Sequence, residues 1–209
     1  KLLFEDDIEK YPSTKKYLEF YKQELKNRYE AKKGICKWYS LSVIRSMDIF
    51  DVQKEKIITP IYSTTNKFGL DSASDNENYF TLSDTTAIQL KDNKYNLKTI
   101  LAILNSKLMN FYFRKNTKLK RDNYCEYITE SLQKIPIKQN SVTDKKIVLL
   151  VDEIISLNKR LNEIKDKQTD EKSRLEKEIQ KIDNEIDEEV YKLYGITEEE
   201  KKIIEESLK

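Results

Sequence analysis

A cationic and aromatic stretch, NFYFRKNTKLKRDNYCEYI at residues 110–128, is the part of this sequence best suited to binding chemistry. Eight Lys or Arg residues and no Asp or Glu occur between Asn93 and Arg121, although the 209-residue chain is almost balanced at 39 basic and 37 acidic side chains. Lys and Arg on a loop neutralise phosphates, and Arg can also bond guanine through two hydrogen bonds. The stretch therefore predicts contacts with double-stranded DNA, and a solvated charged face is the alternative. The predicted contact residues are Arg114, Lys115, Lys118, Lys120, Arg121, Asn123 and Tyr124.

A second candidate surface is YSTTNKF at residues 62–68, at the end of a predicted strand. Its side chains are short and polar, and the two-atom fork of an Asn amide matches the edge of adenine. The segment therefore predicts base contacts, with an ordinary polar turn as the alternative. The predicted contact residues are Ser63, Thr64, Thr65, Asn66 and Lys67.

The chain lacks the residues that several kinds of catalysis require. There is no His, only Cys36 and Cys125 could supply thiols, and three Gly are too few for a phosphate-cradling loop. We therefore assign no catalytic residue, no metal ligand and no cofactor to this sequence. No apolar run is long enough to span a bilayer, which predicts a soluble, cytoplasmic protein. Lys1 in place of Met leads us to expect a fragment of a longer chain.

Helices and β-type segments alternate along the first two thirds of the sequence. Helical spacing over residues 13–30 predicts one amphipathic helix, and period-two alternation from Ile35 to Ile44 predicts a strand. Further strands are predicted in KIITPIYS, NYFTL and TTAIQL, with Pro60 at an edge or a bulge. A helix capped by Asn96 then runs to Phe111 and into the cationic stretch. The expected fold is α+β, with a small, mostly antiparallel sheet flanked by helices.

The last third is helical and acidic. Apolar stripes over residues 147–164 and 175–193, separated by the polar KDKQTDEKSR, predict an antiparallel helical pair, with a single long coiled coil as the alternative. Gly195 suits the C-cap of the second helix, and TEEE from Thr197 predicts a capping box for a last short helix. Seven acids and two lysines between residues 175 and 190 predict a negative side opposite the positive stretch. We expect a domain boundary at 140, giving domains 1–140 and 141–209.

The order of these pieces resembles the C-terminal specificity region of TaqI-type and Eco57I-type enzymes, which are adenine-specific DNA methyltransferases and fused type II restriction-modification enzymes. The resemblance implies a target recognition domain that reads DNA, while an upstream domain binds S-adenosylmethionine and carries an Asn-Pro-Pro-aromatic motif. That motif is absent here, since the only prolines are 12, 60 and 136. The segments that carry the resemblance are YPSTKKYLEFYKQELKNR, KWYSL, EKIITPIYSTTNKFGLD, YFTLSDTTAIQL, LAILNSKLMNFYF, YCEYITESLQKIPI and EIDEEVYKLYGITEEE.

The resemblance also implies partners. They are double-stranded DNA and the upstream catalytic domain of the same chain, with or without a fused endonuclease. Two alternatives stay open: a helical protein-interaction module that self-associates through the C-terminal helices, or half of a type I specificity subunit. The cationic loop departs from the family pattern because TKLKRDNY contains no Gly.

Overall fold

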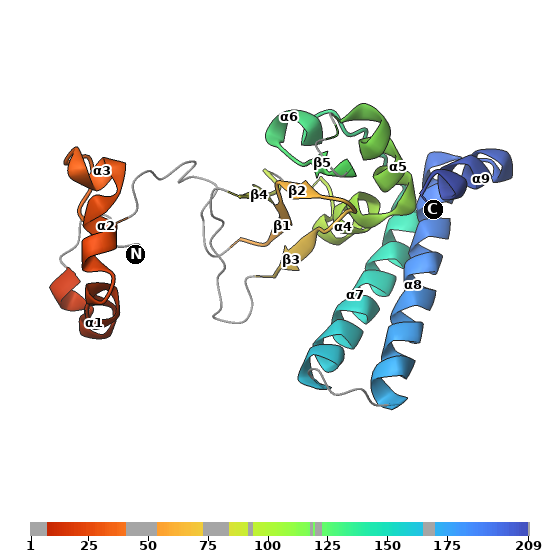
Figure 1. Ribbon diagram of the computed structural model, residues 1–209. Helices are drawn as coiled ribbons and strands as arrows, with labels where there is room; N and C mark the ends of the chain where they lie inside the picture. Colours follow the sequence, from red (N-terminus) through yellow and green to blue (C-terminus); the bar gives the residue numbers. More distant parts are fainter. Residues whose placement is uncertain are drawn as a thin grey trace. The chain divides into compact units, whose positions relative to one another are not determined.

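The computed structural model describes residues 8–40, 54–72, 84–91, 94–117, 119, 123–164 and 170–208. The chain forms two compact units that divide between Asp51 and Val52 (Figure 1). The predicted domain boundary at residue 140 stays a prediction. No helix of the described residues is long and apolar enough to cross a membrane.

The first unit contains only short helices: η1 (Ile8–Lys10), α1 (Pro12–Glu19), α2 (Lys22–Asn27) and α3 (Tyr29–Lys32). The single helix predicted over residues 13–30 is therefore broken. Arg28 has extended backbone angles between α2 and α3, with ψ at 144°. Its guanidinium donates to the carbonyls of Trp38, at 3.0 Å, and Ser40, at 2.8 Å.

These bonds fold residues 35–40 into turns, so the strand predicted from Ile35 is wrong as far as Ser40. Its remainder, from residue 41 to 44, lies outside the described residues. Gly34 has a φ of +70°, in the left-handed region that glycine enters at little cost.

The second unit is built on a three-stranded antiparallel sheet. Its strands are β1 (Lys56–Pro60), β3 (Gly69–Asp71) and β4 (Thr85–Ile88), in the order β3-β1-β4. The predictions for KIITPIYS and TTAIQL are confirmed, while NYFTL lies outside the described residues. β1 is the central strand, not an edge, but Pro60 is its last residue. Because β3 pairs only with Lys56 to Ile58, Pro60 removes no hydrogen bond on that side.

A second antiparallel ladder joins β2 (Tyr62–Ser63) to β5 (Cys125–Glu126). In its register Tyr62 lies opposite Glu126 and Ser63 opposite Cys125. The Tyr127 amide continues this ladder by donating to the Ile61 carbonyl at 2.7 Å. The ladder is connected to β4 of the three-stranded sheet by the Thr86 hydroxyl, which donates to the Tyr127 carbonyl at 2.9 Å.

The predicted helix after Asn96 consists of two helices, α4 (Leu97–Asn105) and α5 (Lys107–Asn116). Asn96 caps α4 as expected, since its side chain accepts a hydrogen bond from the Lys98 amide. Ser106 breaks the run with a ψ of 157°, and its hydroxyl accepts from the Met109 amide to cap α5. The short α6 (Thr129–Leu132) follows β5.

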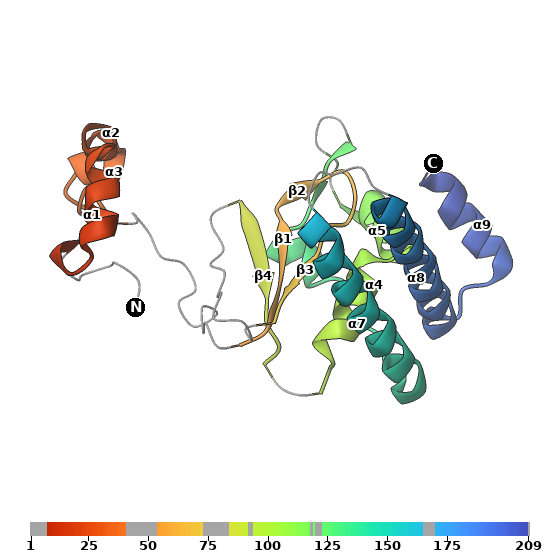
Figure 2. The ribbon, with the colours of Figure 1, turned by 90° about the horizontal axis from the view of Figure 1, so that it is seen from below.

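The C-terminal helices are α7 (Ser141–Ile164), α8 (Asp170–Tyr194) and α9 (Glu198–Ser207). α7 and α8 lie side by side as an antiparallel pair (Figures 1 and 2), which confirms the predicted pair over the coiled-coil alternative. Ion pairs between Arg160 and Glu171 and between Lys146 and Glu189 agree with that register. The predicted cap at Gly195 is consistent with its φ of +73°, and the Thr197–Glu200 capping box is confirmed.

One hydrophobic core joins α4 and α5 to α7 and α8. Ile103, Phe113, Ile147 and Val190 are completely buried in it. The apolar stripes of the helical pair thus pack inside the unit, and the α+β fold class is confirmed.

The sheet also contains a buried ion pair, in which Lys56 Nζ and Asp71 Oδ2 lie 2.5 Å apart across β1 and β3. We expect Asp71→Ala to lower the free energy of unfolding of this unit by about 3–5 kcal/mol, because it strands a buried ammonium. The double change Lys56→Met with Asp71→Leu should restore most of that loss. Urea unfolding followed by far-UV circular dichroism measures both variants.

Trp38, the only tryptophan, lies in the first unit, so its fluorescence is an internal control that should not change. Equal destabilisation by the single and the double change would contradict the ion-pair argument.

Candidate nucleic-acid interface

The β2–β5 ladder brings the two predicted contact regions together, although about sixty residues separate them in the sequence. The residues that follow Ser63 leave the ladder beside those that precede Cys125. Thr64, Thr65 and Lys67 are exposed on the first segment, and Asn123 and Tyr124 are exposed on the second. We call these five residues the paired-loop surface.

Asn123 enters β5 from the left-handed region, with a φ of 62°. Among residues other than Gly, Asn adopts this conformation at a small cost because its side chain is short and polar. The loop therefore needs no glycine at this turn, which explains locally how TKLKRDNY can dispense with one.

Two predicted contact residues of the 62–68 segment have structural roles instead. Ser63 is only 5% exposed. The Asn66 amide nitrogen donates to the Leu104 carbonyl at 2.5 Å, and its oxygen accepts from the Tyr127 hydroxyl at 2.8 Å. Both atoms of the amide fork are thus engaged within the protein, and Asn66 ties its loop to the end of α4.

Tyr127, near the end of the cationic and aromatic stretch, is completely buried, so its ring packs in the core and does not face a nucleic acid. The ring meets those of Phe68 and Phe113 edge to face, at centroid distances of 5.4 Å and 4.8 Å. Burial raises the pKa of the Tyr127 hydroxyl above its ordinary value, which keeps it protonated as a donor to Asn66. We call the hydrogen bond between the Tyr127 hydroxyl and the Asn66 side chain the Asn66–Tyr127 latch; the sequence did not predict it. The sequence also did not predict the role of Asn105, whose side chain bonds both the amide and the carbonyl of Phe68.

The predicted cations have different surroundings. Arg114 is half-buried, and its Nη1 donates to the Ser207 carbonyl of α9 at 3.5 Å. Lys115 is exposed, and its ammonium lies over the Phe111 ring at 5.6 Å from the centroid. Lys118, Lys120 and Arg121 lie outside the described residues.

The predicted negative side opposite the positive stretch is wrong for two lysines of the acid-free span, which pair with the C-terminal helices. Lys98 pairs with Asp152 of α7 at 2.6 Å, and Lys107 pairs with Asp187 of α8 at 3.1 Å. The C-terminal helices thus neutralise these two lysines. They support the fold and are not available to a nucleic acid.

A family model for the TaqI-like C-terminal specificity domain matches residues 1–137. The chain belongs to this family. The match takes in the first unit, both segments of the paired-loop surface and the latch beneath it, and it ends just before α7. Membership implies a target-recognition module that binds DNA.

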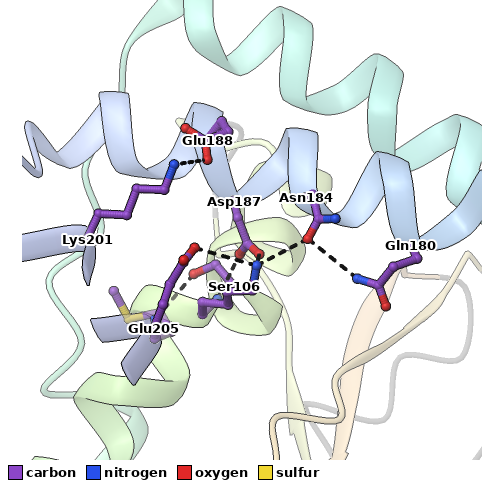
Figure 3. A network of polar contacts seen from close by, with 9 residues as sticks. Ser106, Gln180, Asn184, Asp187, Glu188, Lys201 and Glu205 are labelled. Carbon is purple, nitrogen blue, oxygen red and sulfur yellow. Dashed lines mark hydrogen bonds and ion pairs between the residues drawn. The ribbon is translucent and has the colours of Figure 1, made fainter. Parts of the chain in front are cut away.

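The helices after the matched part hold this specificity domain through Asp187. Its Oδ1 accepts from the Lys107 amide at 2.8 Å, and this amide opens α5. The Lys107 ammonium also reaches Asn184, at 3.1 Å, and Glu205 of α9, at 3.8 Å. Figure 3 shows Asp187, Asn184 and Glu205 converging on this point. Asp187 thus supplies an acceptor for an N–H group that the helix itself leaves unpaired.

Burial raises the pKa of Asp187 above its ordinary value of 3.8, and hydrogen bonds from Lys107 oppose the rise. A raised folded-state pKa gives stability that is complete below the unfolded value and is lost as the pH rises through the folded value. We therefore expect Asp187→Asn, which keeps the oxygen acceptor, to gain stability relative to wild type as the pH rises from below the ordinary carboxyl pKa of 3.8 to above it. Urea unfolding across that range measures the difference. A difference that shrinks or reverses as the pH rises would contradict this assignment.

The latch predicts a second change in stability. Tyr127→Phe removes the donor to Asn66 and should lower the free energy of unfolding by about 1 kcal/mol. Tyr124→Phe is the matched control, because the Tyr124 side chain is exposed three residues away. Urea midpoints measured by circular dichroism should fall for Tyr127→Phe alone. Equal midpoints for the two variants would show that the hydroxyl adds nothing.

Proposed function

We propose that this chain is the DNA-reading part of an adenine-N6 methyltransferase or of a type II restriction-modification enzyme. The observation that carries the proposal is the β2–β5 ladder, which joins the two segments singled out for DNA contact. In a family of specificity domains, polar and cationic side chains gathered on one surface are suited to reading DNA.

The paired-loop surface combines two kinds of contact. Thr64, Thr65 and Asn123 are short enough to approach base edges in the major groove. Lys67 of this surface and the exposed Lys115 of α5 are suited to phosphates, and Tyr124 to sugars. The Asn66–Tyr127 latch supports this division, because a loop that discriminates bases must hold a fixed shape.

S-adenosylmethionine and the catalytic residues belong to the proposed upstream domain of the same chain, so this part discriminates sites without methylating them. Flipping an adenine costs a few kcal/mol of unstacking, and a separate reader can supply binding energy for it. The proposed location is the cytoplasm. The helical-interaction alternative has less support, because the apolar stripes of α7 and α8 are packed within the unit.

Replacing Lys67 and Lys115 together by Ala should weaken binding to duplex DNA. The slope of log K against log salt should flatten by about 0.9 for each phosphate that these lysines no longer neutralise. Fluorescence anisotropy with a labelled duplex at several salt concentrations measures both quantities.

The control for this experiment is Lys177→Ala with Lys202→Ala, which removes the same charge from exposed positions on α8 and α9. An unchanged slope for Lys67→Ala with Lys115→Ala, or an equal change in the control, would exclude the paired-loop surface as the DNA contact.

A further inference from the structure

The helices of the first unit leave their large apolar side chains exposed. No residue of α1, α2 or α3 is buried. Phe20 is 79% exposed, Tyr29 67% and Tyr17 62%. Rings exposed to this degree in one small unit are typical of a surface that binds a partner.

Polar contacts hold the described helices of this unit together. The Arg28 guanidinium donates to the carbonyls of Lys37, Trp38 and Ser40, and the Lys22 ammonium lies over the Trp38 ring at 5.0 Å from the centroid. Two of the exposed rings have a close neighbour: Tyr17 lies 5.5 Å from Tyr21, and the Lys33 ammonium lies 5.9 Å from the Tyr29 centroid. The fold of the described residues does not explain why Phe20, the most exposed of these rings, is aromatic.

The same stretch of sequence is rich in cations. Nine Lys or Arg and three Glu occur between residues 10 and 37, while the whole chain has a net charge of +2. Of the acids that flank this stretch in the sequence, Glu9 pairs with Lys15, and those at 5–7, 48 and 51 lie outside the described residues. Lys16, Lys26 and Lys32 are exposed, and within the described part of the chain no carboxylate pairs with any of them.

We propose that residues 10–37 form a second surface for double-stranded DNA, distinct from the paired-loop surface and indifferent to base sequence. Its lysines contact phosphates, and Phe20 and Tyr29 pack on the sugars between them. Charge complementarity favours DNA over protein as the partner of this surface, because protein interfaces are depleted in Lys whereas phosphates bind cationic side chains. The inference rests on the proposed function for its class of partner, but it concerns different residues and a different kind of contact.

The test measures salt-dependent anisotropy for Lys16→Gln, Lys26→Gln and Lys32→Gln combined, on two duplexes of unrelated sequence. The salt slope should flatten by about 0.9 for each phosphate that is no longer neutralised, equally on both duplexes. Lys145→Gln, Lys177→Gln and Lys202→Gln combined is the matched control, since it removes the same charge from exposed positions on α7, α8 and α9. Trp38 fluorescence and circular dichroism should be unchanged in both variants.

Each alternative result is informative. Equal flattening in the control would show a general effect of net charge and overturn the inference. No flattening, with Phe20→Ala dissolving a dimer in sedimentation, would assign the rings to a second copy of the chain. If DNA binding weakens in Lys67→Ala with Lys115→Ala but not in the first-unit variant, the proposed function stands and residues 10–37 are excluded as a DNA surface. If the wild-type chain binds neither duplex, both proposals fail.

Discussion

The bond between the Asp187 carboxylate and the opening amide of α5 is the contact on which the arrangement of the second unit depends. It fixes the start of α5 against α8, and α5 carries Phe113 into the core beneath Tyr127. Tyr127 in turn holds Asn66, and Asn66 holds the loop of the paired-loop surface against α4. Burial of this carboxylate opposes its charge, and the Lys107 amide and ammonium offset that cost. The C-terminal helices therefore support the reading loops through one continuous chain of contacts.

The same interaction explains why a basic run and an acidic run occur in one nearly neutral chain. The acidic helix was expected to give the molecule a negative side opposite a positive one. Instead, Lys107 meets Asp187 of that helix, and Lys98 meets Asp152 of the helix before it. Opposite charges on packed elements attract more strongly than solvated ones, because the dielectric constant between them is lower. Among the described cations of this run, Lys115 lies exposed near the end of α5, where its charge remains for a partner.

Local signals in the sequence predicted the elements that local interactions determine. Asn96, Gly195 and the Thr197–Glu200 box mark helix ends through contacts within a few residues, and each agrees with the structure. The breaks at Arg28 and Ser106 were not predicted. Arg28 binds carbonyls ten and twelve residues away. Ser106 caps α5 locally through the Met109 amide, but the first amide of this helix bonds to residue 187. The same holds for the site: the two contact segments were recognised by composition, whereas the Asn66–Tyr127 latch joins residues 61 positions apart and has no local signature.

Reading a sequence and holding a duplex place different demands on a protein surface. A base edge is discriminated by hydrogen bonds of fixed length and direction, so its reader must be rigid. A phosphate is recognised mainly by charge, which tolerates movement of long lysine side chains. The buried aromatic latch supplies rigidity beneath Thr64, Thr65 and Lys67. In the first unit, the described helices α1, α2 and α3 bury none of their side chains and are held by Arg28 and by cations over rings. This contrast agrees with the two proposals, in which the second unit discriminates bases and the first contacts DNA independently of its sequence.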